Sequence, residues 1–537
     1  MLEPTSAASF VLSRADVRAL DEKTIASGTA GLDLMERAGE AIVQLLTDPL
    51  RLASAGLAAA ADRRRLLVLA GSGSNGGDGF VVARELTARG WQCTVAMIGR
   101  EPRAGTDACT NLTRWRQLGG HVIDPSGADD AIDAAARDGM LVLDAIFGTG
   151  LDKDVTGPTA DLIQHLNDAR LPVLAADIPS GLCCDTGRPL GAAVRARATA
   201  TIGAAKPGLF VGEGPAHAGR VYVVDIGLLP PRQVGLQPVA TLMDEATMAG
   251  ALPLLSPMAH KGDRGHVLIL AGSPGKSGAA ILAARGALRA GAGLVTVATP
   301  ASVQPDVAAA LPEAMTRALV DDGETGEIST GSVRALHAML DDFDAIVAGP
   351  GLGTGPGAVE AVSEILRAAK GQVILDADAL NVLSALHHEQ RISLLARRPD
   401  APFPILTPHP GEMARLVNRS IEEVQADRLG IAINTARDLR CVLVLKGAGT
   451  IVTDGELVAI NSSGNSGMAC AGMGDVLAGI CGAVAGRILD DLDAARLAVY
   501  AHGAAGDEMA RITGGPGFLA GEVADALPAV LARLSER

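Results

Sequence analysis

The amino-acid sequence predicts an α/β protein of two domains, each with a mostly parallel sheet covered by helices. Its 537 residues are several times a typical domain of roughly 100–200 residues, and 48% are hydrophobic, enough for two sizeable cores. Short runs of valine, isoleucine, leucine and alanine alternate with longer helical stretches, as βα units do. Residues 227–238 contain three prolines and two glycines, which interrupt both patterns and mark the expected boundary.

Twelve apolar runs are expected to be strands, six in each domain. In the first domain they are Leu66–Ala70, Thr94–Ile98, Leu141–Ala145, Val173–Ala176, Ala198–Ile202 and Val221–Val224. In the second domain they are Val267–Ala271, Leu294–Ala298, Ala345–Ala348, Val373–Leu375, Ile405–Leu406 and Val442–Leu445. Several end directly in loops with glycine or aspartate. Because ligands bind at the carboxyl ends of strands in open α/β sheets, functional residues are expected in those loops.

Composition excludes several classes of partner. The net charge is −15 and no block of lysine or arginine offsets it, which argues against nucleic acid and anionic membranes. Aromatic residues are only 2%, too few for base-stacking platforms. The seven cysteines show no metal-site spacing, and the N-terminus has no signal-peptide pattern. The longest apolar run, 476–486, is shorter than the ~20 residues that a membrane span needs. We expect a soluble, cytoplasmic protein with reduced thiols.

A glycine-rich loop, residues 71–79, follows the first predicted strand and precedes a helix expected over 80–89. Gly71, Gly73 and Gly76 satisfy G-x-G-x-x-G, a pattern in which backbone N–H groups hold a pyrophosphate. The acidic ribose ligand of dehydrogenases, expected about 20 residues later, is absent from residues 94–100. The loop therefore argues against an ordinary dehydrogenase, and a purely structural glycine turn is the alternative.

Three further loops follow strands of the first domain: 144–150, 177–181 and 203–208. Their asparagine, aspartate and serine oxygens suit a hard cation with a phosphate nearby. The motifs GSNGGDG, DAIFGTGLDKD, DIPSG and GAAKPG resemble the NAD(P)H-hydrate epimerase domain over roughly residues 10–230. The family usually has asparagine where this chain has Ser74.

This resemblance implies a K⁺ site and a dinucleotide site. The implied K⁺ ligands are Asn75, Asp144 and Ser180. The implied contacts to the damaged dinucleotide are Ser74, Asn75, Gly76, Gly77, Asp78, Gly148, Thr149, Gly150, Leu151, Asp152, Lys153, Asp154 and Asp177. Epimerisation at C6 would lose hydroxide to give a nitrogen-stabilised cation and re-add water on the other face. Asp177 is the first choice for handling the proton and Lys206 the second. The alternatives are a turn-capping carboxylate and a solvated surface lysine.

In the second domain the strongest element is Gly464–Asp475, followed by an apolar helix over 476–480. Small residues before a helix let its N–H groups and dipole attract an anion. Asp475 lies at the same helix start. There it could act as the general base that deprotonates a substrate hydroxyl, which then attacks phosphorus. An N-capping aspartate is the alternative. Residues 272–279 fail the P-loop pattern because Leu270 stands where a glycine is needed, so Lys276 is expected to be an exposed loop residue.

Four more loops of this domain, 349–353, 376–381, 407–412 and 446–450, end predicted strands. The loop 446–450 has the composition of a nucleotide-binding loop. His409 lies between two prolines, which suits a ligand contact better than a core histidine. Asp376 and Asp378 are turn formers or help to position Mg²⁺.

The motifs KGDRGHVLILAGS, GPGLG, LDADALN, LTPHPGE, LKGAGT and GMGD resemble the ADP-dependent NAD(P)H-hydrate dehydratase, a branch of the ribokinase-like fold. The resemblance covers about residues 255–530. It implies nucleotide contacts at Lys446, Gly447, Ala448, Gly449, Thr450 and Gly474. It implies hydrate contacts at Ala279, Gly353, His409 and Asp475. Met473 departs from the small residue or threonine that is common in the family.

Together the two resemblances imply one bifunctional repair enzyme, an isomerase fused to a lyase. A Rossmann-like three-layer domain, 1–235, would interconvert the R and S hydrates of NADH and NADPH, and a ribokinase-like α/β domain, 236–537, would dehydrate the S form. There Asp475 would deprotonate the C6 hydroxyl, and ADP and Mg²⁺ would yield AMP, phosphate and repaired cofactor. The alternative is a kinase for a small alcohol or vitamin with a non-catalytic N-terminal ligand-binding module. The sequence does not decide whether ADP or ATP is the phosphoryl donor. A homo-oligomer is expected.

Overall fold

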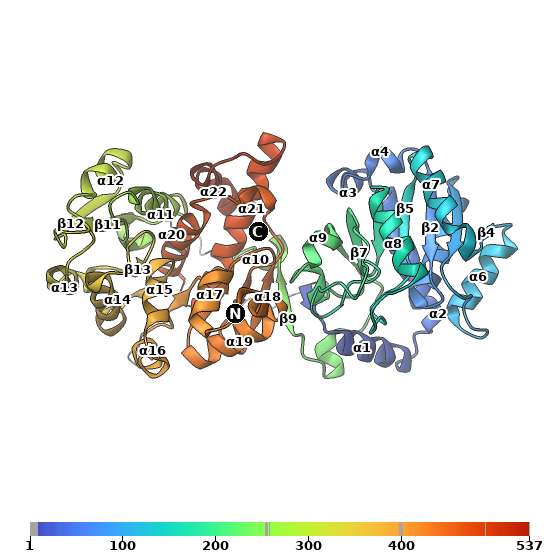
Figure 1. Ribbon diagram of the computed structural model, residues 1–537, viewed down its shortest axis with the longest axis horizontal. Coiled ribbons are helices and arrows are strands. Elements are labelled where there is room, and N and C mark those ends of the chain that lie inside the picture. Colours follow the sequence, from blue (N-terminus) through green and yellow to red (C-terminus); the bar gives the residue numbers. More distant parts are fainter. Residues whose placement is uncertain (1–8, 253–255, 257, 397–400, 489, 536–537) are drawn as a thin grey trace. The chain divides into compact units, whose positions relative to one another are not determined.

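The computed structural model describes residues 9–252, 256, 258–396, 401–488 and 490–535. The chain divides into two compact units between Thr241 and Leu242, six residues beyond the position expected from the sequence. Figure 1 labels many of the helices and strands of both units. None of the helices in these described ranges is long and apolar enough to cross a membrane.

The N-terminal unit is built on a seven-stranded sheet in which every neighbouring pair is parallel. Its strands, in spatial order, are β4 (Val122–Ile123), β3 (Gln92–Met97), β2 (Arg65–Ala70), β5 (Leu141–Ala145), β6 (Val173–Ala176), β7 (Ala198–Ile202) and β8 (Arg220–Val224). The chain order runs outward from β2 in one direction and from β5 in the other. The carboxyl ends of β2 and β5 therefore flank a topological switch point, where doubly wound sheets bind ligands.

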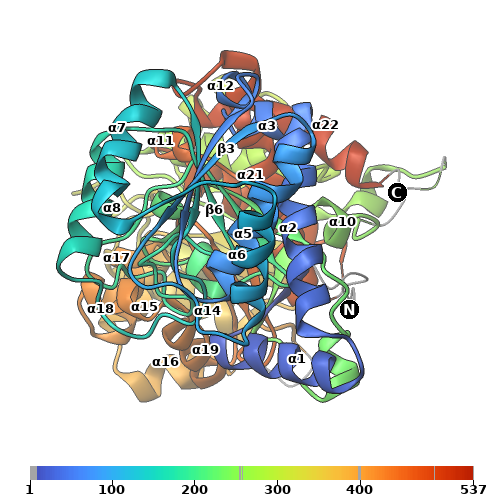
Figure 2. The ribbon, with the colours of Figure 1, turned by 90° about the vertical axis from the view of Figure 1, so that its right-hand side faces the viewer.

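Helices cover both faces of this sheet, which makes three layers (Figure 2). One face carries α2 (Gly31–Thr47), α5 (Ser74–Ala88) and α6 (Asp107–Gln117), and the other carries α7 (Ala128–Asp138) and α8 (Pro158–Asp168). Each face has its own apolar core, with Phe80 buried in one and Ile163 in the other. The remaining helices are α1 (Arg14–Ala26), α3 (Pro49–Ser54), α4 (Ala58–Ala61) and α9 (Gly214–Ala218).

Helix α5 begins at Ser74, six residues before the start expected from the sequence, so that prediction is wrong. Glycine is a poor helix former, which is why the segment was expected to be loop. Packing overrides that preference. A Cβ on Gly76 would lie 1.9 Å from the carbonyl oxygen of Gly71, and a Cβ on Gly71 would lie 2.0 Å from that of Ile146. Only glycine allows the helix to start this close to the end of β5.

The sheet of the C-terminal unit has a parallel part and an antiparallel part. In spatial order it contains β9 (Ala240–Met243), β18 (Val458–Asn461), β17 (Ile451–Thr453), β16 (Val442–Leu445), β15 (Ile405–Leu406), β14 (Gln372–Leu375), β13 (Ala345–Ala348), β10 (His266–Leu270), β11 (Leu294–Pro300) and β12 (Met315–Leu319). From β16 to β12 all pairs are parallel, whereas β17 pairs antiparallel with both neighbours. A second switch point lies between β10 and β13. Within the N-terminal unit, β1 (Phe10–Val11) pairs antiparallel with the first half of β9.

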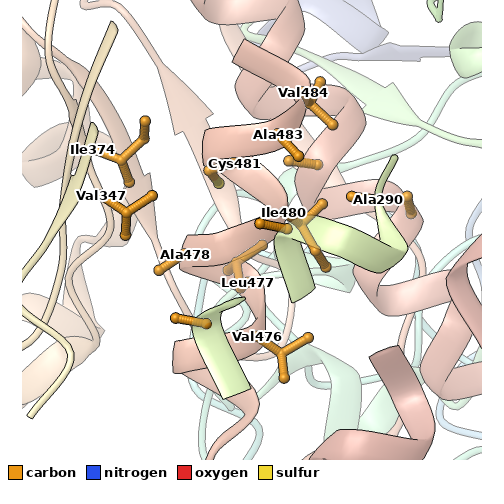
Figure 3. Close-up of a cluster of buried hydrophobic side chains, with 14 of the residues drawn as sticks. Ala290, Val347, Ile374, Val476, Leu477, Ala478, Ile480, Cys481, Ala483 and Val484 are labelled. Atoms are coloured by element: carbon orange, nitrogen blue, oxygen red, sulfur yellow. The ribbon is translucent and has the colours of Figure 1, made fainter. Parts of the chain in front are cut away.

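Four helices of the C-terminal unit share one apolar core: α11 (Ser277–Arg289), α20 (Met473–Ala485), α21 (Asp491–Thr513) and α22 (Ala520–Ser535). Figure 3 shows the side chains of α20 in this core, with Val347 and Ile374 from the sheet beside them. Two glycines bring α11 and α20 together, because a Cβ on Gly479 would lie 1.9 Å from the carbonyl oxygen of Ala283. On Gly286 it would lie 2.5 Å from that of Val476. This close contact fixes the N-terminal end of α20.

The other helices of this unit connect the strands. They are α10 (Glu245–Met248), α12 (Gln304–Ala310), α13 (Val333–His337), α14 (Pro356–Ala368), α15 (Asp378–Ala385), α16 (His388–Leu395), α17 (Pro410–Val417), α18 (Ile421–Ala426) and α19 (Arg428–Leu439).

Candidate active sites

A buried polar cluster lies at the switch point of the N-terminal unit. Asp144 is the last residue but one of β5 and is fully buried. The backbone N–H of Ser180 donates to its Oδ2 at 2.8 Å, and the Ser180 hydroxyl donates to its Oδ1 at 2.5 Å. Asn75 Nδ2 donates to the carbonyl oxygen of Phe147 at 2.9 Å, and the Phe147 N–H donates to Ser180 Oγ at 2.8 Å. Burial raises the pKa of Asp144 to about 6, against the hydrogen bonds from Ser180. Three residues predicted from separate loops thus meet.

One hydrogen-bond acceptor of this cluster is left unsatisfied by the described residues. Asn75 Oδ1 is buried and has no hydrogen-bond partner among the residues described. A buried acceptor without a partner is costly unless a ligand satisfies it. In the described ranges no group of three or more histidine, cysteine or acidic side chains could hold a metal. Any cation here would therefore be held by mixed amide, hydroxyl and carboxylate oxygens, with only one full negative charge.

Asp177 and Lys206 form a second feature of this site. Lys206 Nζ donates to Asp177 Oδ1 at 2.5 Å, to Ile202 O at 2.7 Å and to Thr201 Oγ1 at 3.0 Å. The Lys206 side chain is fully buried, so the alternative of a solvated surface lysine is wrong. Asp177 has φ +66°, a conformation that non-glycine residues adopt at a cost and that is enriched at functional sites.

Gly148 connects the two features. A Cβ on Gly148 would lie 3.3 Å from Asp177 Oδ2 and 3.4 Å from Asn75 Cβ. The second oxygen of Asp177 and the Asn75 side chain therefore face the same glycine of the loop after β5. The buried polar cluster and the ion pair are neighbours at one end of the sheet.

Two further carboxyl groups lie within electrostatic range of this pair. Asp78, in the first two turns of α5, is buried, and burial and the charges of Asp177 and Asp21 raise its pKa well above the usual range. Asp21 on α1 was not predicted; burial raises its pKa to about 6, with Lys206 opposing the shift. Three carboxyl groups thus share one buried ammonium group. Asp21 precedes every recognisable motif, so its sequence context gave no signal.

The other residues predicted for the first site include a packed glycine of α5 and several exposed side chains. Gly77 lies in α5, where a Cβ would be 2.6 Å from Met35 Sδ, so it serves packing. The exposed side chains of this set are Ser74, Asp152, Lys153 and Asp154. Arg14 donates to the carbonyl oxygen of Gly150 at 2.9 Å and lies 3.7 Å from Asp152, which ties this loop to α1.

In the C-terminal unit, charged side chains gather at the ends of β14, β15 and β16. Lys446 Nζ donates to Asp376 Oδ1 at 2.6 Å and lies 3.7 Å from Glu412 Oε2. Thr407 Oγ1 donates to the same Asp376 oxygen at 2.7 Å. The two carboxylates raise the pKa of Lys446 although burial opposes the shift. The ammonium group of Lys446 is thus directed at the acidic cluster.

Asp475 lies in the first turn of α20, beside this cluster. The N-cap of α20 is Gly472, at φ +89° and without a capping side chain, so the alternative of an N-capping Asp475 is wrong. The first N–H groups of a helix have no intrahelical partner and can receive an anion. A Cβ on Gly474 would lie 3.3 Å from Lys446 Nζ. Burial and the nearby Asp376 raise the pKa of Asp475 to about 6.

Asp378 belongs to the opposite side of this site. Its Oδ2 accepts the backbone N–H of Gly353 at 2.9 Å and lies 3.3 Å from Lys276 Nζ. Lys276 is half exposed, as expected, but it is ion-paired rather than free. Ala377 has φ +49° and ψ −116°, a strained conformation for a residue with a side chain. It stands between the buried Asp376 and Asp378. Ala279 lies next to the loop 349–353, because a Cβ on Gly351 would be 3.1 Å from the Ala279 Cβ.

His409 caps helix α17. Its Nδ1 accepts the backbone N–H groups of Gly411 at 3.0 Å and Glu412 at 3.3 Å, and its Nε2 lies 3.2 Å from Glu412 Oε1. The ring is half exposed, so the alternative of a core histidine is wrong.

The loop after β16 is shaped by Arg428, which was not predicted. Its Nη2 donates to the carbonyl oxygens of Leu445 at 3.1 Å and Lys446 at 3.2 Å. Burial lowers the pKa of Arg428 to about 10. Thr450 Oγ1 donates to the carbonyl oxygen of Gly447 at 2.8 Å, which closes the loop on itself. The segment from Gly447 to Thr450 is partly or fully exposed and is available to a ligand.

Comparisons with known proteins agree with both motif sets. Residues 267–529 match the family model described as NAD(P)H-hydrate dehydratase, and residues 31–208 match the one described as YjeF-related protein N-terminus. A bifunctional NAD(P)H-hydrate repair enzyme of Moorella thermoacetica is 42% identical over 478 residues, 88% of each chain. The chain belongs to the family of bifunctional NAD(P)H-hydrate repair enzymes.

Another repair enzyme, from Escherichia coli, is 35% identical over 93% of this chain and 89% of its own. A solved structure of an ADP/ATP-dependent NAD(P)H-hydrate dehydratase from Bacillus subtilis, co-crystallised with ATP and Mg²⁺, is 32% identical. It covers 55% of this chain and 98% of its own, with a TM-score of 0.47. The predicted fold class, α/β with two mostly parallel sheets, is confirmed by the observed sheets. The predicted enzyme of NAD(P)H-hydrate repair is confirmed by the comparisons. The small-alcohol kinase is set aside.

Proposed function

We propose that the N-terminal domain, 1–235, interconverts the R and S hydrates of NADH and NADPH at Asp177 and Lys206. The C-terminal domain, 236–537, then dehydrates the S hydrate at Asp475 with ADP as the phosphoryl donor. The observation that carries the proposal is the position of Asp475, whose pKa is about 6, at the uncapped N-terminus of α20 beside Lys446 and Asp376. A base next to an anion-binding helix end suits a hydroxyl that attacks a phosphate.

In the epimerase reaction, the C6 hydroxyl leaves as water while the ring nitrogen supplies electrons and becomes cationic. Asp177 is the first choice for handling this proton and Lys206, which donates to Asp177 Oδ1 at 2.5 Å, is the second. Burial and the charges of Asp177 and Asp21 raise the pKa of the neighbouring Asp78, which favours the protonated form of that carboxyl group. Water then adds to the other face of C6, and its proton returns to the same set. The dinucleotide contacts the loops 74–78 and 148–154 and Asp177.

The residues of the buried cluster fit a K⁺ ion. The partnerless Oδ1 of Asn75, the carboxylate of Asp144 and the hydroxyl of Ser180 would hold it, with the Phe147 carbonyl oxygen beside them. Oxygen donors with one full charge suit a weakly charged hard cation. When bound, K⁺ supplies a fixed positive charge near the phosphates of the dinucleotide.

In the dehydratase reaction, Asp475 takes the proton of the C6 hydroxyl, and the oxygen attacks the terminal phosphorus of ADP. The P–O bond to AMP breaks. The N–H groups at the start of α20 and Lys446 stabilise the charge that develops. The ring nitrogen then expels the phosphate from C6, and loss of a C5 proton forms the double bond. Asp376 and Asp378 would help to position Mg²⁺, which when bound would neutralise phosphate charge.

The adenine nucleotide is placed along Lys446–Thr450 and Gly474, and the hydrate against Ala279, Gly353 and His409. Support comes from the exposed backbone of the loop after β16 and from the proximity of Gly474 to Lys446. All seven cysteines are free, which fits work in the reducing cytoplasm. The enzyme is proposed to act as a homo-oligomer on small molecules alone.

The test is a 340 nm absorbance assay on a mixture of R and S NADH hydrates with Mg²⁺, K⁺ and ADP. Wild type should recover all the NADH. Asp475→Asn should recover none, and Asp177→Ala should stop near the S fraction and then continue at the spontaneous epimerisation rate. Absence of recovery by a wild-type protein that binds ADP would overturn the proposal.

A further inference from the structure

Helix α1 carries one side chain that reaches the loop after β5, where the dinucleotide is proposed to bind. Arg14 is the first residue of α1. Its Nη2 donates to the carbonyl oxygen of Gly150 at 2.9 Å, and its Nη1 donates to that of Leu151 at 3.3 Å. The same Nη2 lies 3.7 Å from Asp152 Oδ2. One guanidinium group therefore contacts three consecutive residues of the loop.

The loop between Gly148 and Val155 is fixed at both ends. At its start, a Cβ on Gly148 would lie 3.3 Å from Asp177 Oδ2. At its end, the N–H of Val155 donates to the carbonyl oxygen of Leu190 at 2.8 Å. The residues between these ends are partly or fully exposed, and among the described residues it is Arg14 whose side chain hydrogen-bonds to them. The position of the middle of the loop therefore depends on Arg14.

Helix α1 is held in place by contacts that do not involve the Arg14 side chain. The backbone N–H of Arg14 donates to Asp185 Oδ1 at 2.8 Å. The backbone N–H of Leu12, just before the helix, donates to the carbonyl oxygen of Ala205 at 2.9 Å. Leu20 is buried in an apolar cluster with Leu12. Removal of the Arg14 side chain should therefore leave the helix docked.

The same face of α1 also approaches the proposed catalytic pair. Asp21 lies seven residues beyond Arg14, which is about two helical turns, so the two residues share one face of the helix. Burial raises the pKa of Asp21 to about 6, and the charges of Lys206 and Asp177 act on the same carboxyl group. Helix α1 thus lies beside the site at Asp21 as well as at Arg14.

We propose that Arg14 is a positioning residue of the epimerase site. It holds residues 150–152 in the conformation that receives the dinucleotide, and it takes no part in the proton transfer at Asp177 and Lys206. This inference rests on the proposed binding of the hydrate to the loop 148–154. A loop that is fixed before binding loses less conformational freedom when the ligand arrives. Loss of the Arg14 side chain should therefore weaken substrate binding and spare the chemical step.

Steady-state kinetics of full-length Arg14→Met test the proposal. The substrate is pure R hydrate of NADH, and an excess of the Asp177→Asn variant with ADP, K⁺ and Mg²⁺ converts each S hydrate to NADH. The absorbance at 340 nm, less the rate without the tested protein, then reports the epimerase. KM should rise about fivefold, whereas kcat should change less than twofold. The matched control is Arg18→Met, because Arg18 is exposed on the same helix and pairs with Glu22 at 3.0 Å.

Hydrogen exchange measures the loop itself, independently of the reaction. Amides of a peptide covering residues 148–154 should exchange about threefold faster in Arg14→Met than in wild type or Arg18→Met. A peptide covering α8 should exchange equally in all three. Arg14→Lys keeps the charge but has one nitrogen in place of the guanidinium fork, so it should lie between wild type and Arg14→Met in both measurements. It takes the place of Arg14→Met if that variant does not melt like wild type.

The proposal requires both changes. An unchanged KM or unchanged exchange of the loop in a folded variant would overturn it, and so would a fall in kcat without a rise in KM. These results would leave the proposed epimerase intact, because wild type would still interconvert the hydrates. Failure of wild type to convert the R hydrate would instead overturn the proposed function, and the role of Arg14 with it.

Discussion

At the scale of single residues, burial decides which groups can do chemistry. Burial raises the pKa of both Asp475 and Asp144 to about 6, but the two carboxyl groups differ in their surroundings. Asp144 has both carboxylate oxygens in hydrogen bonds from the protein and is fixed in place. Asp475 is partly exposed and faces the end of a helix that no side chain caps. Of the two, only Asp475 is available to a substrate.

The raised pKa of Asp475 predicts the pH profile of the dehydratase. A general base acts only when deprotonated, so a pKa raised to about 6 removes activity as the pH falls through that value. With saturating ADP and S hydrate, kcat should rise about tenfold from pH 5 to pH 7 and then level off. Asp475→Glu, which keeps a carboxylate, should retain a low rate with a shifted profile. A flat wild-type profile between pH 5 and pH 7 would exclude Asp475 as the base.

Lys206 is predicted to be essential for the stability of the N-terminal domain as well as for its reaction. Lys206→Met removes the one buried cation among Asp21, Asp78 and Asp177, and loss of one partner from a buried ion pair costs about 3–5 kcal/mol. The penalty should shrink at low pH, because protonated carboxyls need no partner. Urea unfolding at pH 5 and pH 8 measures this difference. Lys153→Met is the control, since Lys153 is exposed and should have almost no effect.

At the scale of elements, sequence periodicity found the strands that build both sheets. All twelve predicted runs are strands, and most of them are apolar segments buried within a parallel sheet. The edge strand β8 is only partly buried, but its valines still identify it. The strands that were missed lie at sheet edges or in the antiparallel part, such as β4, β12 and β18. β12 is largely exposed and contains Arg317, so its composition does not distinguish it from a loop.

The residues of the two candidate sites also divide into those that the sequence predicted and those that it did not. Loops at strand ends could be predicted because topology places them together, and Asn75, Asp144 and Ser180 do meet. Residues on helices that do not begin in one of these loops could not be predicted. Asp21 lies on α1, Arg428 on α19, and neither has a local pattern that shows where its helix packs. The early start of α5 was missed for a related reason: contacts from distant residues outweigh the low helix propensity of glycine.

The contact between α11 and α20 is predicted to set the position of Asp475. Gly479→Ala would place a methyl group 1.9 Å from the carbonyl oxygen of Ala283, so the helices must separate. Overpacking of this kind costs about 1–3 kcal/mol. Dehydratase kcat should fall at least tenfold while the epimerase rate is unchanged. Gly515→Ala is the control, because nothing lies within 4 Å of its added methyl group. Equal loss of both activities would point to general misfolding instead.

At the scale of the whole molecule, the two proposed sets of site residues belong to two different compact units. Asp144, Asp177 and Lys206 belong to the N-terminal unit, and Lys446 and Asp475 belong to the C-terminal unit. In the proposed scheme, the S hydrate is the product of the first reaction and the substrate of the second. Each of these reactions uses proposed site residues of one unit.

This separation predicts complementation between two inactivated proteins. Asp177→Asn blocks the epimerase and Asp475→Asn blocks the dehydratase, and each alone should fail to repair a pure R hydrate above the spontaneous rate. Mixed at equal concentration, they should recover NADH at a rate set by free S hydrate, because that intermediate can diffuse between chains. The 340 nm absorbance records the recovery. A mixture no faster than the variants, with each remaining site active by itself, would show that the S hydrate passes only within one chain.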